Sequence, residues 1–180
     1  MKIAGFSLPL VLAAASLAAQ EIDLSTLDKL ANRAKESNTI SLDGDSLKTA
    51  SKFLSGADPD MQQAKAVVEG LKGIWVRNFE FKGKEEYGKG DLAPIFKQLK
   101  AGGWSKIVDS RDENEITEIF LHNENQKTVG LAIVAEGPKA LTVVLISGSI
   151  DLDRLGKLSG TLGIPDIELK HKAKPVKDED

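Results

Sequence analysis

The stretch from Trp104 to Ile150 constrains the fold more than any other part of this chain. It holds four short runs rich in β-branched and apolar residues, which suit a pleated, partly buried surface: residues 104–109, 115–122, 128–136 and 140–149. Polar or Gly/Pro breaks of a few residues separate the runs. Four strands joined by short turns predict an antiparallel meander.

Helical patterns flank this predicted sheet along the chain. Apolar residues recur every three or four positions in segments 24–34, 47–54, 61–71, 91–100 and 152–162, and each segment is predicted to be a helix. Asp43 or Asp45 is expected to cap the second helix, and Asp58 with Pro59 to start the third. Two further strands are predicted at 38–43 and 73–82.

This order of elements predicts an α+β fold, in which helices pack on a mostly antiparallel sheet. The strand at 73–82, the helix at 91–100 and the strand from Trp104 form a β-α-β unit. We therefore expect a split β-α-β or ferredoxin-like core joined to the meander. The strands Gly73–Lys82 and Glu115–His122 are the candidates for an open edge of the sheet.

The first nineteen residues have the pattern of an export signal. Lys2 provides the positive start, an apolar run follows, and Ser16-Leu17-Ala18 matches the small-x-small rule for cleavage. We expect a signal peptide at 1–19, a single α+β domain at 20–168 and a charged, disordered tail at 169–180. The mature protein is expected to be periplasmic or secreted, with no transmembrane segment after removal of the signal.

Composition excludes several functional classes. The chain has no cysteine, so disulfides, thiolate catalysis, thiolate zinc sites and a lipoprotein anchor are all excluded. The net charge of the 180 residues is -3, with basic and acidic residues mixed, which argues against a nucleic-acid partner. No metal or cofactor motif is present, so we expect no cofactor.

Residues able to do chemistry are few. His122 is the one histidine outside the predicted tail, and it would act as a base only if Asp109 or Asp112 oriented it. The D-x-D pairs at 43/45 and 151/153 lack the further ligands of a calcium loop and are better explained as helix caps. The glycine-rich run at 156–163 has the wrong spacing for a phosphate loop. We therefore predict no catalytic residues and no metal ligands.

A small-ligand site is predicted on one face of the strand at 73–82. Trp75, Arg77 and Phe79 alternate along this strand and so share a face. If the face is open, the two rings and the guanidinium form a binding platform, with Arg77 contacting an anionic group. If the helix at 91–100 covers it, the same residues are core, an interpretation favoured because that helix needs a partner surface.

Three stretches carry a resemblance to a known family: Thr39–Asp60 (TISLDGDSLKTASKFLSGADPD), Leu71–Phe81 (LKGIWVRNFEF) and Gly103–Leu158. Their order and spacing resemble the exported bacterial proteins grouped as the domain of unknown function 4252 family, over roughly residues 24–162. The resemblance implies an exported, single-domain protein. It implies no activity, cofactor or catalytic residue.

The function expected from the sequence is that of a non-enzymatic envelope module that binds a protein or peptide. A sheet with an open edge is able to accept a partner strand. The alternatives are a small anionic-ligand binder that uses Trp75, Arg77 and Phe79, and a hydrolase based on His122.

Overall fold

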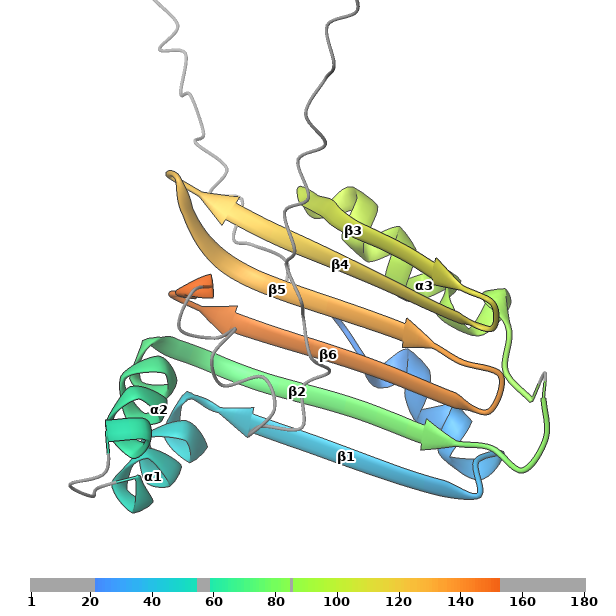
Figure 1. Cartoon of the computed structure of the whole chain (residues 1–180), viewed down its shortest axis with the longest axis horizontal. Coiled ribbons are helices and arrows are strands. Elements are labelled where there is room, and N and C mark those ends of the chain that lie inside the picture. The colour runs from blue at the N-terminus through green and yellow to red at the C-terminus, as the bar shows by residue number, and fades with distance from the viewer. Residues whose placement is uncertain (1–21, 55–58, 85, 153–180) are drawn as a thin grey trace, which may run out of the picture.

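The computed structural model describes residues 22–54, 59–84 and 86–152. A six-stranded sheet forms its centre, with the strand order β1-β2-β6-β5-β4-β3 (Figure 1). Every pair of neighbouring strands is antiparallel. The strands are β1 (Glu36–Asp43), β2 (Leu71–Glu80), β3 (Trp104–Asp112), β4 (Glu115–Glu124), β5 (Lys127–Glu136) and β6 (Ala140–Gly148).

Four helices among the described residues cover the two faces of the sheet. They are the 3-10 helix η1 (Ser25–Asn32) and the α-helices α1 (Gly44–Phe53), α2 (Pro59–Gly70) and α3 (Lys89–Ala101). Figure 1 shows η1 and α3 behind the sheet, and α1 and α2 at the lower left, beside β1 and β2. The fold class expected from the sequence, a mostly antiparallel sheet with helices packed on it, is confirmed.

Alternation along the strands divides the apolar side chains into two cores. The core under η1 and α3 includes Leu27, Leu30, Phe79, Leu92, Ile95, Leu99, Phe120, Val134, Leu141 and Val143. The core on the other face includes Leu47, Val67, Val68, Ile119, Leu121, Leu131, Ile133, Val144 and Ile146. Strands β4, β5 and β6 contribute to both cores, which explains why their sequences are apolar on both faces.

The helix starts follow the expected capping chemistry. Asp43 caps α1, and its side chain accepts a hydrogen bond of 2.8 Å from the Ser46 backbone N–H. Asp91 lies in the first turn of α3 and accepts from the Gly88 backbone N–H at 3.1 Å. Phe53, expected on the apolar stripe of α1, is instead 80% exposed at the end of that helix.

The four-strand meander is confirmed as β3 to β6, because these strands are neighbours in chain order. The β-α-β unit of β2, α3 and β3 is also present, but β6, β5 and β4 lie between its two strands. The sheet therefore has six strands, whereas the β-α-β-β-α-β pattern of a ferredoxin-like fold has four.

The prediction of the open edges was wrong. The strands proposed for the edge, Gly73–Lys82 and Glu115–His122, correspond to β2 and β4, and each is paired on both sides. The edges of the sheet are β1 and β3. β2 and β4 carry apolar residues on both faces, which the two cores cover, as is typical of interior strands.

Several sequence-based expectations concern residues outside the described part of the chain. They are the signal peptide at 1–19, the N-cap at Asp58, the last helix beyond Leu152, the glycine-rich run at 156–163 and the tail at 169–180. Within the described residues, none of the helices combines the length and the apolar character needed to span a bilayer.

Candidate functional site

Strand β1 exposes backbone hydrogen-bonding groups at one edge of the sheet. All eight of its residues pair with β2 without a register shift, from Glu36 opposite Glu80 to Asp43 opposite Gly73. In an antiparallel ladder, a residue's N–H and C=O point to the same side, and successive residues point to opposite sides. Alternate residues of β1 therefore direct both groups away from β2.

Two backbone hydrogen bonds show which residues of β1 face outward. Phe81 donates its N–H to the Lys139 carbonyl at 2.7 Å, which continues the pairing of β2 with β6. The odd-numbered residues of β2 therefore bond to β6, and its even-numbered residues bond to β1. The bond from the Lys35 N–H to the Glu80 carbonyl, 2.7 Å, agrees with this assignment. The outward-facing residues of β1 are thus Ser37, Thr39, Ser41 and Asp43, and the last of these also caps α1.

The opposite edge, β3, is protected in ways that β1 is not. A bulge interrupts the pairing of β3 with β4 between Lys106 and Val108. Lys106 and Arg111 on β3 form ion pairs with Asp109 at 2.6 and 3.1 Å. Bulges and charged side chains are the usual devices that prevent a further strand from pairing. β1 has no bulge, and its charged residues are confined to its two ends.

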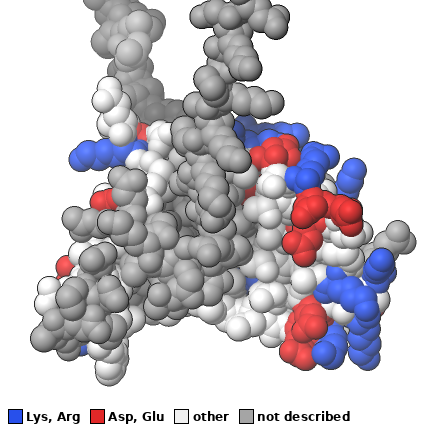
Figure 2. All heavy atoms as spheres, in the orientation of Figure 1, with Lys and Arg blue, Asp and Glu red and all other residues white. Residues whose placement is uncertain are grey.

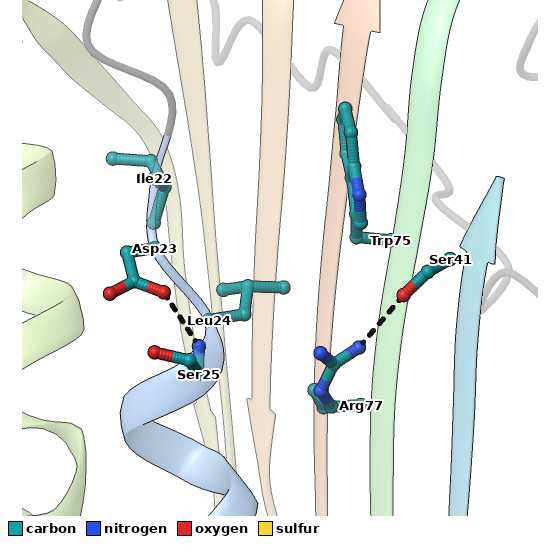
Figure 3. Close-up of a pocket in the computed structure, with 7 residues that line it drawn as sticks. All are labelled: Ile22, Asp23, Leu24, Ser25, Ser41, Trp75 and Arg77. Carbon is teal, nitrogen blue, oxygen red and sulfur yellow. Dashed lines mark hydrogen bonds between the residues drawn. The ribbon is translucent and has the colours of Figure 1, made fainter. Parts of the chain in front are cut away.

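A pocket of about 380 Å³ lies beside β1, between the strands and the segment that enters η1 (Figure 3). Its lining residues are Ile22, Asp23, Leu24, Ser25, Ser41, Trp75 and Arg77. In Figure 3, Leu24 points across the pocket toward Trp75 and Arg77, and Ser41 of β1 lies on the far side of the pocket from Leu24. Two of the three predicted site residues, Trp75 and Arg77, therefore line a pocket.

The third predicted residue, Phe79, lies elsewhere. Its side chain is 1% exposed and belongs to the core under η1 and α3. The cover over this face of β2 comes from η1, whereas α3 contacts η1 and β3. Phe79 is therefore core, whereas Trp75 is half-buried and the Arg77 side chain is 11% exposed.

Arg77 is already held by other protein groups. Its Nε donates to Asp28 of η1 at 3.0 Å, and its Nη1 contacts the Ser41 hydroxyl at 3.4 Å and the Val76 carbonyl at 3.2 Å. Hydrogen bonds from Ser25, led by the side-chain interaction, lower the pKa of Asp23 on the pocket wall. At neutral pH the Arg77 guanidinium is therefore paired with the Asp28 carboxylate, and a second carboxylate, that of Asp23, lines the same pocket.

The position of the Trp75 ring depends on Gly73. A Cβ atom at Gly73 would collide with the ring atoms of Trp75, two residues along the same face of β2. The ring therefore occupies the space that a side chain at this position would fill. Gly73 sets one wall of the pocket, although it is not itself a lining residue.

A second pocket, of about 390 Å³, lies on the opposite face of the sheet beside the other end of β1. It is lined by Glu36, Ser37, Asn38, Asn78, Glu80 and Ala140. Lys35 pairs with both glutamates, at 3.0 Å from Glu36 and 3.9 Å from Glu80. The edge strand thus has a pocket beside it on each face of the sheet.

The geometry does not assemble the predicted histidine site. His122 on β4 lies opposite Trp104, and Asp109 lies opposite Glu118, so roughly 15 Å of strand separates the two. Hydrogen bonds from Lys106 first and Arg111 second lower the pKa of Asp109 and engage its carboxylate. Asp112 is farther along β3 still, opposite Glu115.

Metal ligation finds no support in the part of the chain that the structure describes. No group of three histidine or carboxylate side chains there is arranged to hold an ion. In the first D-x-D pair, Asp43 is the helix cap and Asp45 accepts from Lys48 at 3.2 Å.

Charged side chains of both signs lie interleaved on the face shown in Figure 2, mostly at its right-hand side.

A comparison with known protein families identifies the family of this chain. A family described as "Domain of unknown function (DUF4252)" matches residues 32–158. The chain belongs to the DUF4252 family. The resemblance inferred from the sequence is thereby confirmed, and the match covers β1 to β6. Comparisons with curated proteins and with solved structures return no match.

Sequence reasoning missed the edge residues of this DUF4252 domain. Ser37, Thr39 and Ser41 place a hydroxyl at every second position, a pattern typical of a strand with one polar, uncovered face. The other face of β1 holds only two apolar residues, Ile40 and Leu42. A strand with so few apolar residues has little to bury and belongs at an edge, which is the signal that was available.

Proposed function

We propose that this DUF4252 domain is a non-enzymatic module that binds a protein or peptide partner by adding the partner's strand to β1. The observation that carries the proposal is the outward-facing backbone of Ser37, Thr39 and Ser41 on a regular edge strand. Each of these residues offers one N–H and one C=O. Strand addition uses such groups for affinity.

The pockets on either side of β1 support the same function. Successive side chains of an added strand point to opposite faces of the sheet. Those on one face would lie next to the pocket with Trp75 and Ser41, and those on the other face next to the pocket with Asn38 and Asn78. Pockets that receive alternate side chains are the usual source of specificity in this mode of binding.

The proposed setting is the cell envelope or the exterior. The export pattern of residues 1–19 supports it. A partner would then be another envelope protein or an exported peptide.

Site-specific cross-linking tests the proposal in the cells that make the protein. A photoreactive residue replaces Ser37 at the edge, and cross-linked products are identified by mass spectrometry. We expect one dominant partner, cross-linked through an extended segment. Thr39→Pro should abolish the product, because proline removes the outward N–H at the middle of the edge.

The matched control is Thr39→Val. It removes the same hydroxyl but keeps the N–H and a β-branched side chain, so cross-linking should persist. Circular dichroism and thermal unfolding establish that both variants are folded. Cross-linking that survives in a folded Thr39→Pro variant would contradict strand addition.

A small anionic ligand in the pocket of Trp75 and Arg77 is the second candidate. The pocket volume of about 380 Å³ and the half-buried indole favour it. The anion would have to share Arg77 with Asp28. Thermal-shift measurements with small anions test it, and a stabilising anion should lose its effect in Arg77→Gln.

A further inference from the structure

The charges around the β1 edge are mainly negative. The relevant residues are the paired residues of the β1–β2 ladder (36–43 and 73–80), the linings of the two pockets beside it and the ion-pair partners of these residues. Lys72, at the start of β2, lies just outside this set. Among them the described chain has five carboxylates and two cations: Asp23, Asp28, Glu36, Asp43 and Glu80, against Lys35 and Arg77. Both cations already contact carboxylates, Lys35 with Glu36 and Arg77 with Asp28.

The excess of carboxylates is present on both faces of the edge. On the face of Ser37, Thr39 and Ser41, Asp23 belongs to the pocket that also contains the Trp75 ring. On the other face, Glu36 and Glu80 share the single cation Lys35. An added strand would therefore meet negative charge on either side.

We infer that the strand accepted by β1 is a basic segment, with lysine or arginine among the side chains that alternate toward the two pockets. The inference rests on the proposed function and specifies its partner. A basic side chain would lay its apolar stem on Leu24 and Trp75 and bring its charge to Asp23. A basic side chain that points to the opposite face would lie next to Glu36 and Glu80.

Other occupants of this edge fit less well. An acidic segment would place like charges next to Glu36 and Asp23, and like charges at neighbouring positions of a sheet are destabilising. A second copy of this chain would bring two acidic β1 edges together, with the same consequence. Complementary charge also speeds association, because it steers the encounter of the partners.

Two synthetic ten-residue peptides test the inference. They share one alternating threonine-valine sequence and differ at three positions, which are lysine in one peptide and glutamate in the other. Binding to the purified protein is followed by fluorescence anisotropy. We expect the lysine peptide to bind about tenfold more tightly than the glutamate peptide at low salt, and the difference to shrink near 0.5 M salt.

Variants of the protein separate this site from general attraction of positive charge. Asp23→Asn should weaken binding of the lysine peptide several-fold. Glu113→Gln, a neutralisation in the turn after β3 on the opposite edge, should leave it unchanged. Thr39→Pro should abolish binding, whereas Thr39→Val should retain it. Lysine-peptide binding that is indifferent to both Asp23→Asn and Thr39→Pro would overturn the inference.

The outcomes distinguish the two proposals. If the glutamate peptide binds as well as the lysine peptide and both require the Thr39 N–H, strand addition stands and the basic partner is wrong. If neither peptide binds at millimolar concentration, the basic-segment inference fails, and cross-linking at Ser37 decides the proposed function by itself.

Discussion

At the scale of single residues, the pocket beside β1 depends on positions that do not themselves line it. Gly73 leaves room for the ring of Trp75, and Asp28 holds Arg77 against the floor of the pocket. Asp28 is 49 positions from Arg77 in the chain. The shape of the pocket is therefore a property of the packed molecule, although Trp75 and Arg77 themselves were visible in the sequence as neighbours on one strand face.

Gly73→Ala should displace the Trp75 ring. The added methyl group overlaps the ring position, and such overpacking costs about 1–3 kcal/mol of unfolding free energy. We expect a lower midpoint in chemical denaturation and a changed tryptophan emission spectrum. The control is Gly90→Ala, because an added Cβ there meets no atom within 4 Å and should cost nothing. A Gly73→Ala variant with unaltered stability and emission would contradict the described ring position.

At the scale of elements, Asp91 joins η1 to α3. Its carboxylate accepts hydrogen bonds from the Gly88 N–H at 3.1 Å and from Arg33 at 2.8 Å, and it lies 3.2 Å from Lys29. Burial alone would raise the pKa of Asp91, but these bonds from Gly88, Arg33 and Lys29 outweigh it, so the pKa is lowered. The Asp91 side chain thus caps the first turn of α3 and also links η1 to that helix.

Asp91→Asn should destabilise the protein by about 1–2 kcal/mol at pH 7, because a cap and two charged contacts are weakened. A carboxyl whose pKa is lowered by folding stabilises the fold above its unfolded pKa, and that contribution is lost as the pH falls through the folded pKa. The difference in unfolding free energy between Asp91→Asn and the parent protein should therefore narrow as the pH falls below 3.8, the ordinary pKa of an aspartate side chain. Urea denaturation at several pH values measures it.

The control for this experiment is Asp45→Asn on α1. The Asp45 side chain is 94% exposed and its partner Lys48 is 79% exposed, so the pair is worth little. An equal loss of stability in both variants, or a difference for Asp91→Asn that persists unchanged at pH 2, would show that the carboxylate does not join the two helices.

At the scale of the whole molecule, the sheet separates two cores, and β1 lies at one side of both. The interior strands β4, β5 and β6 are buried between the cores, whereas β1 is exposed along nearly its whole length. A partner strand could therefore be added without disturbing either core.

Export of the whole chain is a prediction that the sequence alone supports. Expression of the full 180 residues in a bacterium with a general export pathway should yield a product outside the cytoplasm that begins at residue 19 or 20. Mass spectrometry of the intact product measures the cleavage point. Ala18→Arg should block cleavage after residue 18, because a large charged residue replaces the small one that precedes the cleaved bond. A full-length product in the cytoplasm would refute the export signal.

Features that depend on residues close together in the chain were predicted from the sequence, whereas the position of each strand in the sheet was not. Alternating and helical patterns depend on neighbours a few residues apart, so the strands 38–43 and 73–82, the meander and a cap at Asp43 or Asp45 were predictable. The assignment of β2 and β4 to open edges failed, although their apolar residues on both faces already indicated interior strands.

The sequence by itself determined the α+β class, the antiparallel meander and the shared face of Trp75 and Arg77, because these follow from the periods of strand and helix. Only the tertiary structure decided the strand order, the exposure of β1 and the pairing of Arg77 with Asp28. The physical reason is that strand order depends on which apolar faces bury one another across the whole chain. The open edge that carries the proposed function belongs to the strand with the least to bury.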